Sequence, residues 1–193
     1  MVVMVGAICG LFPEEFYIRN GRIDPKDYIP PEMLRDDAEG FLMVSILLHP
    51  FSAGCIALRS ADFRAAPVIH ANYLADDRDL LTLATGALQC VRLAQQMGHH
   101  NIVLPEDLRH FPRDSLELWK IMAKRFCSTL YHPTSTCAMG RVCDSSLRVK
   151  GVQGLRVADA SVFPHITSGN TNAPAIMVGE MASDFIKLAH NLK

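Results

Sequence analysis

The stretch "LRVADASVFPHITSGNTNAPAIMVGEMASDFI", residues 155–186, contains three successive predicted elements. Residues 155–161 ("LRVADAS") predict a short strand with polar residues at its end, and "SGNTNAP" (168–174) predicts a turn. A helix is expected from about Asn172 onward, because Pro174 is tolerated in a first helical turn and apolar residues recur after it. The start of that helix presents unpaired backbone N–H groups, which attract negative charge.

The region before this stretch predicts antiparallel strands. Residues 54–62 and 66–74 are expected to be neighbouring antiparallel strands, joined by a short turn that contains Asp62 and Arg64. "FLMVSILLHP" (41–50) is a dense apolar run that ends in proline, and its length fits a buried strand. The strands therefore occupy the front of the chain.

A long helix is predicted over residues 76–100. Asp76 or Asp77 can cap its N-terminus, and Gly98 stands where a helix commonly ends. One apolar face is expected to be buried, and it consists of Leu80, Ala84, Ala87, Val91 and Ala94. This is the strongest local signal in the front half of the chain.

A second helix is predicted over 114–127, with Asp114 and Glu117 forming a capping box. Residues 14–40 are polar and rich in proline and glycine, which indicates an irregular surface segment. Residues 1–13 are apolar and are expected to start a buried strand or helix. Antiparallel strands in front and a strand, turn and helix at the back together predict an α+β fold.

Composition excludes several classes of protein. Apolar residues make up 49% of the 193 residues, which predicts a folded globular chain. The net charge of -1, with scattered Lys and Arg, gives no basic surface for nucleic acid and favours small neutral or zwitterionic partners. The apolar residues 1–13 are too few to span a bilayer and lack the basic start and cleavage site of a signal peptide, so we expect a cytoplasmic protein without membrane contact.

The six cysteines form no C-x-x-C pair and are expected to be mostly buried free thiols. A metal site would have to use His132, Cys137, Cys143 and His165. Their spacing fits none of the usual zinc patterns, so no metal is expected.

The segment "TLYHPTSTCAMGR" (129–141) places His132 directly before a proline. A residue before proline is disfavoured in helical geometry, so the preceding helix must end before it and the imidazole lies on an extended segment. An imidazole held in this way is a candidate proton acceptor, because its pKa lies near neutrality. The alternative is a structural histidine in the core or in a surface turn, and His49 before Pro50 offers a comparison in the same chain.

Three blocks in order, "YHPTSTCAMG" (131–140), "SSLRVKGVQGLRVADASVFP" (145–164) and "SGNTNAPAIMVGEMASDFI" (168–186), closely resemble a known signature. It is the C-terminal signature of the glucose–methanol–choline (GMC) flavin oxidoreductases, which include choline dehydrogenases, alcohol oxidases and pyridoxine oxidase. Residues 54–94 also resemble the substrate-binding region of that family. The resemblance implies an FAD-dependent oxidoreductase that takes a hydride from a primary or secondary alcohol.

The resemblance also implies roles for individual residues. His132 matches the active-site histidine, which takes the hydroxyl proton while the hydride leaves for flavin N5. Asn170 matches a second active-site position, occupied by His or Asn in the family, that hydrogen-bonds the substrate oxygen. Implied cofactor contacts are Tyr131 at the flavin edge, Asp159 and Ala160 near the phosphate–ribityl region, and Asn172 and Ala173 at the pyrimidine side of the ring.

One family feature is missing from the sequence. GMC enzymes carry a Rossmann-type G-x-G-x-x-G loop, but no two of the 12 glycines here are separated by a single residue. We therefore expect residues 1–128 to be a substrate-binding portion and 129–193 to be the catalytic and flavin-facing segment, without the N-terminal Rossmann part. The chain is then a fragment, a subunit whose complementary chain carries the Rossmann half, or a product with a misassigned start.

These expectations leave the activity of the isolated chain open. We expect weak or no flavin binding and little turnover without the Rossmann half. The alternatives are a non-catalytic remnant that serves as an interaction module, or a lyase on the same scaffold.

Overall fold

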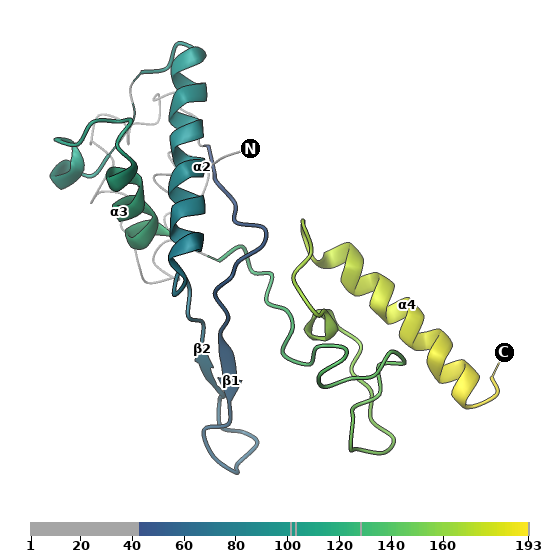
Figure 1. Ribbon diagram of the computed structural model, residues 1–193. Helices are drawn as coiled ribbons and strands as arrows, with labels where there is room; N and C mark the ends of the chain where they lie inside the picture. Colours follow the sequence, from purple (N-terminus) through teal and green to yellow (C-terminus); the bar gives the residue numbers. More distant parts are fainter. Residues whose placement is uncertain (1–42, 101, 103, 128, 193) are drawn as a thin grey trace, which may run out of the picture. The chain divides into compact units, whose positions relative to one another are not determined.

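The computed structural model describes residues 43–192, except residues 101, 103 and 128 (Figure 1). Its elements, in chain order, are β1 (Cys55–Ala57), β2 (Val68–His70), α2 (Asp77–Gln96), the 3-10 turn η3 (Glu106–Leu108), α3 (Leu116–Phe126), the 3-10 turn η4 (Ala160–Val162) and α4 (Asn172–Ala189). The elements predicted for residues 1–40 lie outside the described residues. A small antiparallel sheet with helices agrees with the expected α+β class.

Contacts divide the chain into two compact units. In the described part, the first unit contains residues 43–47 and 74–127, and the second contains 48–73 and 129–192. The first unit therefore carries α2 and α3, and the second carries the β1–β2 hairpin, η4 and α4. The assignment of a substrate-binding role to 1–128 and a catalytic role to 129–193 stays a prediction.

Helix α2 forms as its sequence predicts, and Asp76 is its N-cap. The Asp76 carboxylate accepts a hydrogen bond from the Arg78 backbone N–H at 3.0 Å. The side-chain hydrogen bond from Arg78 also lowers the pKa of Asp76 to about 2, so the cap is ionised at neutral pH. All five residues of the predicted apolar face are buried: Leu80, Ala84, Ala87, Val91 and Ala94.

Gly98 ends α2 in a left-handed conformation, with φ +85°. The Gly98 N–H donates to the Gln95 carbonyl at 3.0 Å, and the His99 N–H donates to the Ala94 carbonyl at 2.9 Å. This pair of bonds is a Schellman motif, which satisfies carbonyls that the helix end would otherwise leave open.

Substitution of Gly98 by alanine is expected to lower the free energy of unfolding by about 1 kcal/mol, because only the left-handed backbone opposes a side chain there. A Cβ at this position would meet no atom within 4 Å, so no steric clash adds to the cost. Gly98→Asn is the matched control and should lose less, since asparagine tolerates this conformation. Urea unfolding followed by circular dichroism measures both. Equal losses in the two variants would contradict the backbone explanation.

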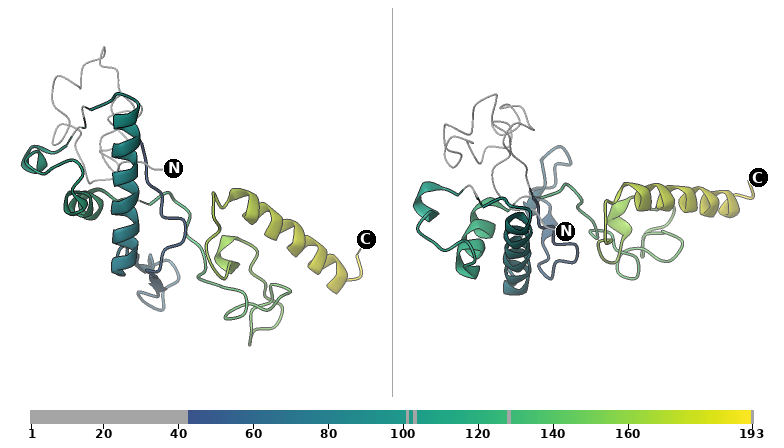
Figure 2. Two further views of the ribbon diagram at one scale, coloured as in Figure 1. Left: turned by 45° about the horizontal axis from the view of Figure 1, so that its top comes forward. Right: turned by 90° about the horizontal axis from the view of Figure 1, so that it is seen from above.

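Helices α2 and α3 lie side by side in both Figures 1 and 2 and enclose the core of the first unit. That core includes Leu88, Val91, Leu118, Trp119 and Met122, all buried. The Trp119 indole N–H donates to the Arg113 carbonyl at 2.8 Å, so its polar atom is satisfied although the ring is 1% exposed. The helix pair buries its large side chains without leaving this donor unpaired.

The predicted capping box at the start of α3 is wrong. Ser115 is the N-cap, and its hydroxyl accepts from the Leu118 N–H at 3.3 Å, while Asp114 lies in the preceding turn. The helix therefore starts one residue later than an Asp114 cap requires, and Glu117 is no longer three residues after the cap. A hydroxyl and a carboxylate cap equally well, so two adjacent candidates could not be separated by residue type.

The predicted strand over 41–50 is also wrong for its described part. Residues 43–50 form an irregular segment with a single bridge residue at Val44. The Ser45 hydroxyl donates to the Leu83 carbonyl at 3.4 Å, and a Cβ on Gly86 would come within 2.1 Å of the Ser45 oxygen. The beginning of this segment is thus packed against α2, which takes the place of a neighbouring strand.

The predicted antiparallel strand pair is confirmed, in shorter form. β1 and β2 pair with Cys55 opposite His70, Ile56 opposite Ile69 and Ala57 opposite Val68. The hairpin needs the glycine at 54, because a Cβ there would lie 2.1 Å from the His70 carbonyl oxygen.

The predicted strand over 155–161 does not form. It contributes one isolated bridge, Arg148 with Arg156, and its last residues enter η4. A strand needs a neighbour along its whole length, and in the described residues only this bridge is present. The adjacent core of the second unit instead packs α4 through Val178 and Ala182 onto Cys143, Leu147, Val162 and Phe163.

The described cysteines, residues 55, 90, 127, 137 and 143, are all free thiols. Cys90 and Cys143 are buried as expected, Cys127 and Cys137 are half-buried, and Cys55 is exposed. Burial raises the pKa of the Cys90 thiol to about 12, which keeps it protonated and unreactive.

A thiol reagent at mildly alkaline pH is therefore expected to modify Cys55 rapidly and Cys90 only after unfolding. Mass spectrometry of the modified peptides measures both rates, and the urea-unfolded chain is the control in which the two should react alike. Rapid native labelling of Cys90 would show that the α2–α3 core opens.

No helix in the described ranges has the length and apolarity needed to cross a membrane.

Candidate active site

His132 lies where the backbone is tightly constrained. Tyr131 before it has φ +63°, in the left-handed region that bulky residues seldom adopt, and Pro133 follows it. The Tyr131 N–H donates to the Thr129 hydroxyl at 3.0 Å. Helix α3 ends at Phe126, as the His-Pro pair predicts. An unusual conformation that is kept by its surroundings often marks a functional segment.

The imidazole of His132 has one partner among the described residues. Its Nδ1 lies 3.0 Å from the Thr171 hydroxyl oxygen, across 39 positions of sequence. Thr171 is 8% exposed, and it is the residue before the first residue of α4. Where Nδ1–H donates to this hydroxyl, the lone pair lies on Nε2, which makes no hydrogen bond within the described part of the chain.

The His132 segment is also joined to the segment that contains Asp159 and Ala160. The Ser135 N–H donates to the Ala160 carbonyl at 3.4 Å, and the Cys137 N–H donates to the Ser161 carbonyl at 2.8 Å. Asp159 is exposed, and its carboxylate accepts from the Ser161 N–H at 2.7 Å, which caps η4. The structure thus places residues 135–137, three to five positions after His132, directly beside 160–161.

The start of α4 offers free donors. Thr171 makes no side-chain cap: its backbone is helical (φ -83°, ψ -1°), and its hydroxyl contacts His132 instead. The Asn172 and Ala173 N–H groups belong to the unpaired first turn. Both residues and Asn170 are exposed. A Cβ on Gly169 would meet no atom within 4 Å, so the turn before the helix faces open space.

All seven predicted site residues therefore lie in the second unit. His132 contacts the residue that follows Asn170, and its segment is bonded to Ala160. Tyr131 is 60% exposed and belongs to the same segment. Sequence reasoning assigned no role to Thr171. The available signal was a hydroxyl residue directly before the predicted helix start.

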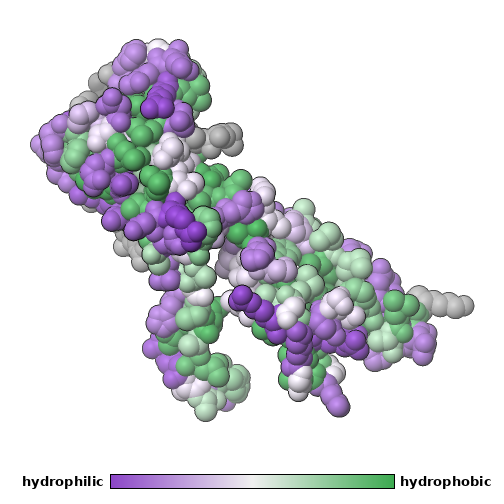
Figure 3. Space-filling view, in the orientation of Figure 1, coloured by the Kyte–Doolittle hydropathy of each residue, from purple (hydrophilic) through white to green (hydrophobic). Residues whose placement is uncertain are grey.

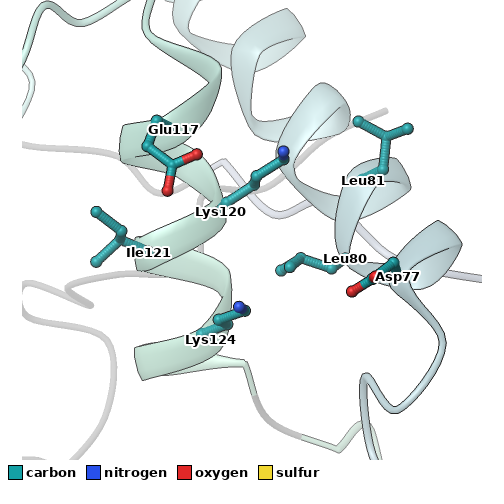
Figure 4. A pocket seen from close by; sticks show the side chains of 7 residues that line it. All are labelled: Asp77, Leu80, Leu81, Glu117, Lys120, Ile121 and Lys124. Carbon is teal, nitrogen blue, oxygen red and sulfur yellow. The ribbon is translucent and has the colours of Figure 1, made fainter.

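A metal site and a ligand pocket are the two other kinds of site to compare with this one. No group of three His, Cys, Asp or Glu side chains suited to a metal ion occurs in residues 43–192 that the structure describes. A hollow of about 350 Å³ between α2 and α3 is lined by Leu80, Leu81, Ile121, Asp77, Glu117, Lys120 and Lys124 (Figure 4). None of the predicted site residues lines this hollow.

Comparison with known proteins identifies close relatives. An uncharacterized GMC-type oxidoreductase of Mycobacterium tuberculosis is 41% identical over 173 residues, which cover 84% of this chain and 32% of that protein. Mitochondrial choline dehydrogenase of Mus musculus is 39% identical over 148 residues, covering 70% of this chain and 24% of that protein. A variant of Aspergillus oryzae formate oxidase superposes with a TM-score of 0.65 and 32% identity, over 78% of this chain and 27% of that one.

The chain spans about a third or less of the length of these relatives. A sequence profile of the family described as GMC oxidoreductase matches residues 50–179, which include His132, the η4 segment and the start of α4. The resemblance of the three sequence blocks is thereby confirmed: this chain belongs to the GMC oxidoreductase family.

Proposed function

We propose that this chain forms the substrate-facing, C-terminal part of an FAD-dependent oxidoreductase that oxidises a primary or secondary alcohol. One observation carries the proposal: in a GMC-family chain, the His132 imidazole is bonded to Thr171, beside Asn170 and the open start of α4. The names of relatives support the substrate class, since one is a choline dehydrogenase and another an alcohol dehydrogenase of Pseudomonas putida.

The residues present suit a flavin. The first-turn N–H groups of Asn172 and Ala173 favour the negative charge that a reduced flavin carries at its pyrimidine side. Open space also surrounds the position of a Cβ at Gly169, in the turn before the helix. Bound FAD would accept the hydride of the alcohol carbon at N5. We assign the flavin edge to Tyr131 and the phosphate–ribityl region to Asp159 and Ala160.

The proton step belongs to His132. With Nδ1–H donated to Thr171, Nε2 is free to take the hydroxyl proton of the alcohol. Pro133 and the Thr171 contact fix the orientation of the ring in advance, so it need not be organised during the reaction. The Asn170 amide would donate a hydrogen bond to the substrate oxygen and hold it near Nε2.

The proposal also predicts a further portion of protein in the working enzyme. We infer that a Rossmann-type portion, on a complementary chain or on a longer form of this one, supplies the adenine and pyrophosphate contacts. Exposed apolar side chains along α4 support this: Ile176 is 58%, Met177 60% and Met181 46% exposed, and green surface covers part of this helix in Figure 3. Such a surface normally packs against more protein.

The test has two parts. The purified chain mixed with FAD should retain little flavin after gel filtration, because most nucleotide contacts are missing. The native assembly, isolated with its partner polypeptide, should carry flavin and oxidise an alcohol. A stoichiometric yellow complex of the isolated chain would contradict the need for a further portion, and a flavin-free native assembly would contradict the proposed function.

Asn170→Ala in the flavin-loaded assembly is expected to lower kcat about ten- to a hundredfold, because it removes one hydrogen bond to the reacting oxygen. Asn170→His is the matched control and should keep most of the turnover, since histidine also donates a hydrogen bond. Steady-state rates with saturating alcohol measure both variants. Full activity in Asn170→Ala would exclude the proposed contact.

A further inference from the structure

A second histidine contacts the turn that carries Asn170. His49 Nε2 lies 2.8 Å from the Ser168 hydroxyl oxygen, although the two residues are 119 positions apart. Both belong to the second unit. His49 precedes Pro50, just as His132 precedes Pro133. Two His-Pro histidines therefore contact hydroxyl residues of the same short turn.

The two contacts flank Asn170. Ser168 is bonded to His49 at one end of the turn, and Thr171 is bonded to His132 at the other end, at 3.0 Å. Gly169 and Asn170 lie between them. The remaining side-chain contact is the Thr167 hydroxyl, which donates to the Gly169 carbonyl at 3.3 Å.

The turn depends on these side chains for its shape. Within the described residues, no backbone–backbone hydrogen bond involves positions 164–170; the first one after Phe163 joins Ala175 to Thr171. A segment without backbone bonds opens easily unless side chains hold it. An Asn170 amide on a loose turn would point at the substrate oxygen only part of the time.

His49 is itself held firmly enough to serve as an anchor. Pro50 restricts its backbone to extended geometry. A few residues later the Asn72 amide donates to the Ala53 carbonyl at 2.9 Å, and Gly54 passes so close to His70 that no Cβ would fit. The β1–β2 hairpin and these contacts hold the chain from residue 53 onward, four positions after His49.

We propose that His49 is a positioning residue for Asn170. Its bond to Ser168 fixes the near end of the turn, and the bond between His132 and Thr171 fixes the far end. The role in catalysis rests on the proposed function, whereas the anchoring of the turn does not. His49 lies one residue before the region that the family profile matches.

The first experiment measures anchoring in the full chain by NMR relaxation of the backbone amides, which reports rigidity whether or not an amide is hydrogen-bonded. In His49→Leu and in Ser168→Ala, the order parameters of residues 165–170 should fall from about 0.85, typical of rigid backbone, to below about 0.6. The double variant should fall no further than either single one. His49→Gln, which keeps a polar end group, should restore most of the order. His190→Leu, an exposed histidine after α4, is the matched control.

Unchanged order parameters in both single variants would overturn the proposal, and so would fully additive effects in the double variant. The amides of α4 report in every sample that the second unit is folded. These results stand whether or not the assembly oxidises an alcohol, so failure of the anchor and failure of the proposed function are told apart.

The second experiment tests positioning in the flavin-loaded assembly. His49→Leu should lower kcat severalfold in the wild-type background and leave it unchanged in the Asn170→Ala background, because its effect passes through that amide. KM should change less than kcat in the wild-type background. An equal loss of kcat in both backgrounds would show a general structural role and contradict positioning.

Discussion

His132→Ala in the flavin-loaded assembly should lower turnover about 10²–10⁴-fold while the flavin content stays unchanged. The reason is the lone pair on Nε2, which the Thr171 contact at Nδ1 leaves available for the hydroxyl proton. Without the imidazole, the alcohol must lose its proton to water while the hydride departs. Stopped-flow reduction of the flavin by the alcohol measures this step directly.

His190→Ala is the control for this change, since that exposed histidine follows α4 and takes no part in the site. Its reduction rate should equal that of the unmodified assembly. If His132→Ala reduced the flavin at the normal rate, another group would have to act as the base. A parallel loss of flavin and of rate would instead assign His132 to cofactor binding.

Trp119→Ala should destabilise the first unit by about 3–5 kcal/mol, the usual cost of removing a large aromatic side chain from a packed core. Trp119 is 1% exposed and packs in the core between α2 and α3, so its removal would leave a large cavity there. The substitution also leaves the Arg113 carbonyl without the hydrogen bond from the indole N–H. Urea unfolding followed by helical circular dichroism gives the free energy.

Two variants bracket that value. Trp119→Phe keeps most of the volume and loses the hydrogen bond, so its cost should fall well below that of alanine. Leu93→Ala, at a position 48% exposed on α2, should change stability by about 0.5 kcal/mol or less. A loss below about 1 kcal/mol in Trp119→Ala would mean that the α2–α3 core is less tightly packed than the structure shows.

The helices were predictable because their signals are local. The Asp76 cap, the apolar face of α2 and the Gly98 end all lie within one helix, and each is found where the pattern placed it. The strands over 41–50 and 155–161 were wrongly predicted because a strand is defined by a partner elsewhere in space. Periodicity alone does not reveal whether that partner is present.

The sequence also predicted the residues of the candidate site but not the contacts between them. His132, Asn170 and the start of α4 were identified through the family resemblance, and Pro174 independently marked the helix start. The contacts of His132 with Thr171 and of His49 with Ser168 were not foreseen, because they join side chains across 39 and 119 positions. No spacing rule within one element reaches that far.

Helix α4 starts without a side-chain cap, and this matters for protein engineering. A helix start is commonly strengthened by a side chain that caps it, with a gain of about 1 kcal/mol. Here the hydroxyl of Thr171, the residue placed to do so, instead contacts the His132 imidazole. Variants at position 171 that are selected for a higher Tm should therefore show a lower kcat. A residue that caps the helix would no longer hold the His132 imidazole.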